Sequence, residues 1–190
     1  GRGDVVPPLR LPRRLLAAAL DLLFPPRCVA CDAPAWDAPL LCFDCAGRIP
    51  PPEPRCPRCG RPCGPGVRAA SCARCAGEPS RLDGVVAAWT YAGLPRTLVI
   101  GFKFRARPEV AEVLGRGLAD ALRGAGIPGD LLVPVPLSRR RRRERGFNQA
   151  ALLARVVGRE LRLDLGERAL VRHRHTPPQV GQSPGRRRRS

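Results

Sequence analysis

The sequence predicts an α/β domain with a mainly parallel sheet, preceded by a small module that depends on bound zinc. Three observations predict this organisation. Four Cys-x-x-Cys pairs lie within residues 28–75, large apolar side chains are scarce there, and helix and strand patterns begin only at about Arg81. Cysteine is absent after residue 75. The composition therefore divides the chain into a metal-dependent part and a part with an ordinary hydrophobic core.

The first residues are expected to carry no stable fold of their own. Residues 1–14 are rich in proline and arginine and are predicted to be disordered. Residues 15–27 predict a short amphipathic helix that ends at two prolines. Its apolar run is far shorter than the roughly 20 residues of a membrane span, and no small-residue cleavage site follows it. A cytoplasmic location is therefore the default expectation.

Eight of the nine cysteines have the spacing of metal ligands. Two thiolates separated by two residues on a tight turn can reach one ion, and two such turns complete a tetrahedral zinc site. We expect sequential sites, although a cross-braced arrangement also fits. The predicted ligands of the two structural zinc ions are Cys28, Cys31, Cys42 and Cys45, then Cys56, Cys59, Cys72 and Cys75. Cys63 remains as a free thiol, and four thiolates leave no open position for chemistry.

Residues 28–80, the predicted double zinc ribbon, contain too few apolar side chains to fold without metal. A fully buried apolar side chain contributes about 1.5–3 kcal/mol, whereas ordering one residue costs about 1–2 kcal/mol. Structural zinc contributes about 10–16 kcal/mol per site. The large apolar side chains of this region are Val29, Trp36, Leu40, Leu41, Phe43, Ile49 and Val67.

Three other interpretations of the cysteines are weaker. A disulfide framework needs an oxidising compartment and leaves one cysteine unpaired. A thioredoxin-like redox pair needs a strand-to-helix setting, and Pro57 between Cys56 and Cys59 suits a zinc-ribbon turn at least as well. An iron–sulfur cluster has less regular ligand spacing.

The remaining residues, 81–190, alternate between strand and helix patterns. A β-branched and aromatic run predicts a strand over 84–91, and Pro108 opens a helix with apolar residues every four positions that ends near Gly124. The apolar run 130–135 predicts a strand buried on both faces. A second helix follows from about Asn148.

A weaker strand is expected over 169–173. The alternation of helices and strands is typical of an α/β domain with a mainly parallel sheet.

A basic stretch follows the predicted buried strand. Val133–Ser138 forms a proline-constrained strand end, and Arg139–Arg143 predict a basic loop. The next helix opens near Asn148, where its N-terminal amides can bind an anion. Because ligands of open α/β sheets bind beyond the carboxyl ends of strands, we expect a phosphate or pyrophosphate ligand. A solvated arginine run is the simpler alternative.

The net charge of +18 also indicates an anionic partner such as nucleic acid. However, only Lys103 among the 34 basic residues is a lysine, and there are 23 prolines and 20 glycines. This bias is typical of a GC-rich coding sequence, so the charge alone does not identify a ligand.

In the order of its parts the chain resembles the ComF competence-protein family, which has a leading helix, a double zinc ribbon and a phosphoribosyltransferase-like domain. The matching pieces are Leu22–Cys28, the four cysteine pairs, Tyr91, Lys103-Phe104, Val133–Ser138, Arg145–Gln149, and Thr176 with Gln179.

The resemblance implies an incomplete type I phosphoribosyltransferase-like parallel sheet over 81–190, which binds phosphoribosyl pyrophosphate with Mg²⁺. Its candidate phosphate or pyrophosphate ligands are Pro136, Leu137, Ser138, Arg145, Asn148, Gln149 and Lys103. Residues 173–179 match the mobile loop that covers the site, with His173 and His175 as exposed bystanders.

The family resemblance also implies a role in handling single-stranded DNA during natural competence, together with the competence machinery. Phe147 or Trp89 could then stack on bases.

The sequence departs from the family at one important point. The paired acidic residues and the Thr-Thr-Gly-x-Thr segment that cradle the ribose phosphate do not occur in these 190 residues. We therefore expect a truncated member that is inactive as a transferase, and its catalytic residues stay unassigned. The alternatives are a nucleic-acid-binding zinc-ribbon protein and a zinc-ribbon interaction module without enzymatic activity.

Overall fold

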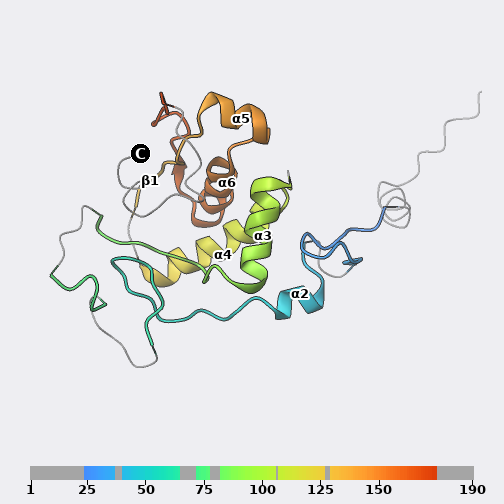
Figure 1. The fold of residues 1–190 in the computed structure, drawn as a ribbon, viewed down its shortest axis with the longest axis horizontal. Coiled ribbons are helices and arrows are strands. Elements are labelled where there is room, and N and C mark those ends of the chain that lie inside the picture. The colour runs from blue at the N-terminus through green and yellow to red at the C-terminus, as the bar shows by residue number, and fades with distance from the viewer. Residues whose placement is uncertain are drawn as a thin grey trace, which may run out of the picture.

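The computed structural model describes residues 24–36, 40–64, 72–77, 82–105, 107–126 and 129–174. The predicted disordered segment 1–14, most of the predicted helix 15–27, and His175, Thr176 and Gln179 lie outside these ranges. The elements are α2 (Phe43–Gly47), α3 (Gly93–Phe104), α4 (Val110–Ala125), β1 (Leu131–Leu132), α5 (Arg139–Arg145), α6 (Gln149–Leu161) and β2 (Asp164–Leu165) (Figure 1).

Three helices form the centre of the molecule. Helix α4 packs against both α3 and α6, and the contact with α6 is the more extensive. The two helices approach closely at Gly115, where an added Cβ would lie 2.6 Å from the Cβ of Val156. Helix α4 ends at Gly126, whose φ of 61° is the left-handed conformation of a helix C-terminus. The two helices predicted from apolar periodicity are thus α4 and α6.

The first cysteine-rich turn shares a hydrophobic core with these helices. Cys28 and Cys45 belong to one buried cluster with Leu98 and Phe102 of α3. Arg107, between α3 and α4, donates hydrogen bonds to the carbonyl of Val29 and to the carboxylate of Asp32 at 2.9 and 2.5 Å. In Figure 1 this turn, in blue and cyan, lies beside α3. The first cysteine-rich turn is therefore packed against the helical core and does not form an independent domain.

The sheet of the described residues is a single parallel pair. Leu131 pairs with Asp164 and Leu132 with Leu165. The parallel direction agrees with the sequence prediction, but the predicted burial of 130–135 on both faces is wrong, because Val135 is 67% exposed. Leu131 of β1 is also 52% exposed.

Two other strand predictions are wrong. The segment 84–91 forms no strand; instead, the amide of Val85 donates to the carbonyl of Pro57 at 2.8 Å. Its β-branched and aromatic side chains pack between the second cysteine-rich turn and α4. The segment 169–173 is also irregular, and the second strand, β2, lies earlier in the chain.

Three helices were not predicted, namely the five-residue α2, α3 and α5. Helix α3 begins at Gly93 and contains Pro95 and Gly101, which weaken a sequence-based assignment. Helix α5 occupies the predicted basic loop and begins after Ser138, whose hydroxyl accepts a hydrogen bond from the amide of Arg141 at 3.4 Å. The arginine run therefore forms a short helix instead of an irregular loop.

Gly117 of α4 offers a stability test. A Cβ at this position would lie 1.9 Å from the ring of Trp89, so we expect Gly117→Ala to lower the free energy of unfolding by about 1–3 kcal/mol. Gly124→Ala on the same helix is the matched control, since nothing lies within 4 Å of its added Cβ. This change should be neutral or stabilising by up to about 1 kcal/mol. Denaturant unfolding of both variants measures the difference, and equal midpoints would contradict the packing described here.

Candidate functional site

The two cysteine-rich turns are copies of one ten-residue unit. The pattern Pro-Arg-Cys-x-x-Cys-x-x-Pro-x occupies residues 26–35 and occurs again at 54–63. The Cys-x-x-Cys spacing alone does not show this longer repeat. The repeat is visible in the Pro-Arg before each first cysteine and in the proline three residues after each second cysteine. These residues do not bind metal; they determine the backbone conformation of the turn.

The two units have the same hydrogen bonds. The amides of Cys28 and Cys56 donate to the carbonyls of Ala33 and Arg61, each at 2.8 Å. The arginine before each first cysteine reaches across its turn: Arg27 donates to the carbonyl of Asp32 at 2.9 Å, and Arg55 to the carbonyl of Gly60 at 3.0 Å. Asp32 and Gly60 adopt positive φ angles of 62° and 69°. The turn is therefore fixed by backbone geometry and not only by its sulfurs.

The sulfurs form two sequential tetrads. Within each tetrad the Sγ atoms all lie within 4.8 Å of one another. The Cys31–Cys42 and Cys59–Cys72 separations are 3.7 and 3.8 Å. Tetrahedral zinc with Zn–S bonds of about 2.3 Å places its sulfurs about 3.8 Å apart, so both tetrads fit structural zinc. All nine cysteines are free of disulfide bonds. The tetrads are Cys28, Cys31, Cys42, Cys45 and Cys56, Cys59, Cys72, Cys75.

Backbone amides stabilise thiolates in both tetrads. The amide of Cys72, 3.3 Å from the sulfur of Cys56, lowers the pKa of that thiol to about 6. Burial raises the pKa of Cys28, but nearby amides outweigh burial and bring it to about 6. Burial raises the pKa of Cys45. Only a bound cation would allow all four sulfurs of a tetrad to be thiolates together, which is the state that zinc requires.

Cys63 belongs to neither tetrad. It occupies the last position of the second unit, where the first unit has the buried Ala35. Its thiol donates to the carbonyl of Arg61 at 3.8 Å, and burial raises its pKa.

The candidate anion-binding residues of the second half are held by two helix caps. The buried Ser138 caps α5, and the side-chain oxygen of Asn148 caps α6 by accepting from the amide of Ala150 at 3.1 Å. The amide group of Asn148 also donates to the carbonyl of Val135 at 3.2 Å. This bond connects the start of α6 to Val135, which follows β1 in the chain. Pro136 and Leu137 therefore lie between two held residues, Val135 and the capping residue Ser138.

Arg145, Gln149 and the end of α3 complete the cluster. The guanidinium of Arg145 donates to the side-chain oxygen of Gln149 at 3.3 Å and lies 5.5 Å from the ring centroid of Phe104. Phe104 and Lys103 are the last two residues of α3. Gln149 is 6% exposed, and its side-chain Nε2 has no acceptor among the described residues. The structure thus brings candidate residues together from the ends of α3 and α5 and the start of α6.

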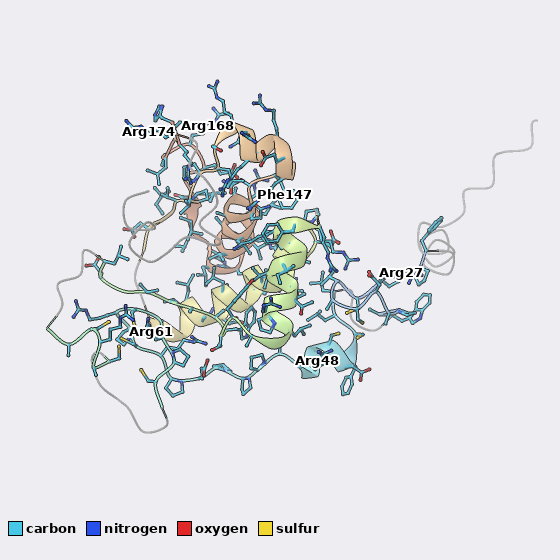
Figure 2. The ribbon with its side chains drawn as sticks, in the orientation of Figure 1. Arg27, Arg48, Arg61, Phe147, Arg168 and Arg174 are labelled. Carbon is cyan, nitrogen blue, oxygen red and sulfur yellow. The ribbon has the colours of Figure 1, made fainter. Side chains whose placement is uncertain are left out.

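The aromatic residues proposed to stack on bases occupy other positions than expected. The ring of Phe147 lies 5.7 Å from that of Phe102 and packs on the core between α3 and α6 (Figure 2). Trp89 is partly buried against Gly117. The exposed aromatic side chains are instead Phe104, beside Arg145, and Tyr91, just before the start of α3. His173 is exposed, as expected.

A cavity of about 640 Å³ lies away from this cluster. It is enclosed by residues 49–57, the segment 85–89 and helix α4, with Trp89 in its wall. None of the candidate anion-binding residues lines it, whereas Cys56 of the second tetrad does.

The described residues contain no helix that is both long and apolar enough to cross a membrane. A comparison with solved structures gave no match, so the phosphoribosyltransferase-type fold stays a prediction.

Comparison with known proteins gives related sequences for both halves of the chain. Residues 19–76 match the double zinc ribbon domain. The DNA utilization protein YhgH of Salmonella typhi is 33% identical over 144 residues, which cover 73% of this chain and 63% of YhgH. YhgH of Escherichia coli K12 is 32% identical with the same coverage. The competence protein ComFC of Bacillus subtilis is 30% identical over 154 residues, covering 70% of this chain and 62% of ComFC.

The chain thus spans less than two thirds of the length of these relatives. The double zinc ribbon match, over residues 19–76, contains both cysteine tetrads. The chain belongs to the ComF family.

Proposed function

We propose that this protein handles single-stranded DNA, and that the cluster around Arg145 and Gln149 binds the pyrophosphate of phosphoribosyl pyrophosphate. The relatives are named for DNA utilization and competence, which supports the first part. The observation that carries the second part is the buried amide of Gln149, whose nitrogen lacks an acceptor among the described residues although its oxygen is bound by Arg145. An unsatisfied buried donor is costly, and an oxygen-rich anion would supply its acceptor.

The groups near Gln149 suit such an anion. The N-terminus of the 13-residue helix α6 contributes backbone amides and the positive end of its dipole. Arg145 of α5 contributes a full positive charge, and Lys103 is the neighbour in sequence of Phe104, whose ring centroid lies 5.5 Å from the Arg145 guanidinium. Glu144, the nearest acidic residue in sequence, is paired with Arg140 at 2.9 Å. Mg²⁺, when bound, would neutralise part of the pyrophosphate charge and would be held mainly by the oxygens of the ligand and by water.

The proposal concerns binding and not transfer of the phosphoribosyl group. The Thr-Thr-Gly-x-Thr segment expected to cradle the ribose phosphate does not occur in these 190 residues. We therefore propose only the pyrophosphate-binding half of a phosphoribosyltransferase-type site, and we assign no catalytic residue.

Calorimetry with Mg²⁺ and phosphoribosyl pyrophosphate tests the anion site. Arg145→Gln removes a charged hydrogen-bond donor, which typically contributes about 1.5–3 kcal/mol, so we expect affinity to fall about 10- to 150-fold. Arg140→Gln on α5 is the matched control, because Arg140 is exposed and paired with Glu144. It should leave the affinity within about twofold.

A second candidate function is nucleic-acid binding without any nucleotide site, which the net charge of +18 favours. Calorimetry with the Mg²⁺ complex of phosphoribosyl pyrophosphate and a binding assay with oligonucleotides together distinguish the two functions. Heat on addition of the Mg²⁺ complex supports the pyrophosphate site. Oligonucleotide binding without such heat would leave only the second function.

A further inference from the structure

The solvent-facing side of α3 extends from the candidate anion cluster at Lys103 toward Arg96 and Tyr91, which that cluster does not use. Arg96, Ile100 and Lys103 share one face of this helix at spacings of four and three residues. Leu98 and Phe102 lie on the opposite face in the core. The helix therefore has an apolar side against α4 and a basic side toward solvent.

An exposed aromatic ring lies at each end of this basic side. Tyr91, just before α3, is 61% exposed, and the guanidinium of Arg96 lies 6.0 Å from its ring centroid. Phe104, the last residue of α3, is 67% exposed and has Arg145 at 5.5 Å. Each ring is thus paired with a cation while much of its surface stays accessible to another planar group.

The segment that contains α3 carries charges of one sign in its own sequence, and the carboxylate that approaches it beside Tyr91, Glu53, accepts hydrogen bonds from Thr90 and Arg55. Residues 84–108 contain no aspartate or glutamate, but they contain four basic residues. One of these, Arg107, is paired with Asp32. Among the described residues, no carboxylate lies within 4.0 Å of Arg96, Lys103 or Arg145. Cations interleaved with exposed aromatic rings are the combination that binds single-stranded nucleic acid, where phosphates need charge and bases need a stacking surface.

We propose that Tyr91, Arg96, Lys103, Phe104 and Arg145, together called the α3 surface, form a binding track for single-stranded DNA. Bases stack on Tyr91 and Phe104, and the phosphates between them face the cations. This inference rests on the DNA-handling function proposed above. The twelve residues of α3 extend about 18 Å, within the length of a site for several nucleotides. A duplex would hold its bases stacked inside and could not use the two rings.

Fluorescence anisotropy with a labelled oligo(dT) tests the α3 surface in the zinc-loaded full chain. The variant with both Tyr91→Ala and Phe104→Ala should bind at least about tenfold more weakly, since one stacked base contributes about 5- to 150-fold. The slope of log K against log salt should not change, because no charge is removed. Arg96→Gln should instead reduce that slope by about 0.7.

Phe43→Ala is the matched control, because Phe43 is 91% exposed on α2, outside the α3 surface. It should leave affinity unchanged. Tyr91 is the only tyrosine of the chain, so protein labelled with 3-fluorotyrosine gives a single ¹⁹F signal from this surface. That signal should shift on titration with oligo(dT), and this readout needs no substitution.

The outcomes separate the two proposals. Absence of oligo(dT) binding by the unmodified protein would overturn the DNA-handling function and the track with it. Binding with an unmoved ¹⁹F signal, or with equal affinity of the double variant, would overturn the α3 surface alone. Equal losses of oligo(dT) affinity in Phe43→Ala and in the double variant would also overturn it, because base stacking would then not be confined to the α3 surface.

Discussion

Replacing Cys28 with serine is expected to reduce bound zinc from two equivalents to one and to unfold the first cysteine-rich turn. Cys28 is fully buried and belongs both to the first tetrad and to the hydrophobic cluster around α3. A structural zinc site contributes about 10–16 kcal/mol, which exceeds the whole stability of a typical domain. Elemental analysis of purified protein measures the zinc content, and circular dichroism follows the fold.

Cys63→Ser is the control for this experiment, because Cys63 is a cysteine of the same region outside both tetrads. It should retain two equivalents of zinc. Cys56→Ser should also retain one equivalent, but from the first tetrad. Full zinc content in Cys28→Ser, or loss of zinc in Cys63→Ser, would show that the tetrads do not hold metal as described.

The cysteine half was the more predictable half, because metal ligands must appear in the sequence at fixed spacing. The pair spacing and the shortage of apolar residues predicted two four-cysteine sites. The spacing left sequential and cross-braced arrangements open, since it does not determine which turns meet in space. That choice depends on contacts between turns far apart in the sequence, such as the hydrogen bond from the amide of Cys72 to the sulfur of Cys56. The attachment of the first turn to α3 also depends on contacts between distant residues, such as Arg107 with Asp32.

The second half was predictable where one helix face is apolar. Helices α4 and α6 have this periodicity, and their ends at Gly126 and Asn148 follow ordinary capping rules. Helix α5 has no apolar face because it is a run of arginines, although Ser138 at its start was a usable signal. The segment 84–91 has strand composition, but its amide at Val85 bonds to a metal-binding turn, which no local pattern reveals.

The candidate anion site was predictable only in part for the same reason. The residues from Pro136 to Gln149 are close in sequence, and their placement after a strand identified them. The burial of Gln149 and the proximity of Phe104 to Arg145 depend on how α3 packs beside α6. The exposed rings Tyr91 and Phe104 were therefore missed, while the partly buried Phe147 and Trp89 were chosen for their residue type alone.

Replacing Phe102 with alanine is expected to lower the free energy of unfolding by about 3–5 kcal/mol, because its side chain is almost fully buried and leaves a cavity when truncated. The hydrophobic cluster that contains Phe102 also contains Cys28 and Cys45. The substitution should therefore also destabilise the first zinc site. In a Cys56→Ser background, where only the first tetrad can hold zinc, Phe102→Ala should release zinc to a chelator faster than the parent does.

Val157→Ala in the same background is the control, since Val157 is buried on α6 outside that cluster. It should lower the unfolding midpoint while leaving the rate of zinc release close to that of the parent below the transition. Equal acceleration by both variants would mean that zinc release follows global unfolding and not the shared core. Faster release in Phe102→Ala alone would show that the first zinc site and α3 are stabilised by one set of contacts, so that the metal supports the helix whose outer face we assign to DNA.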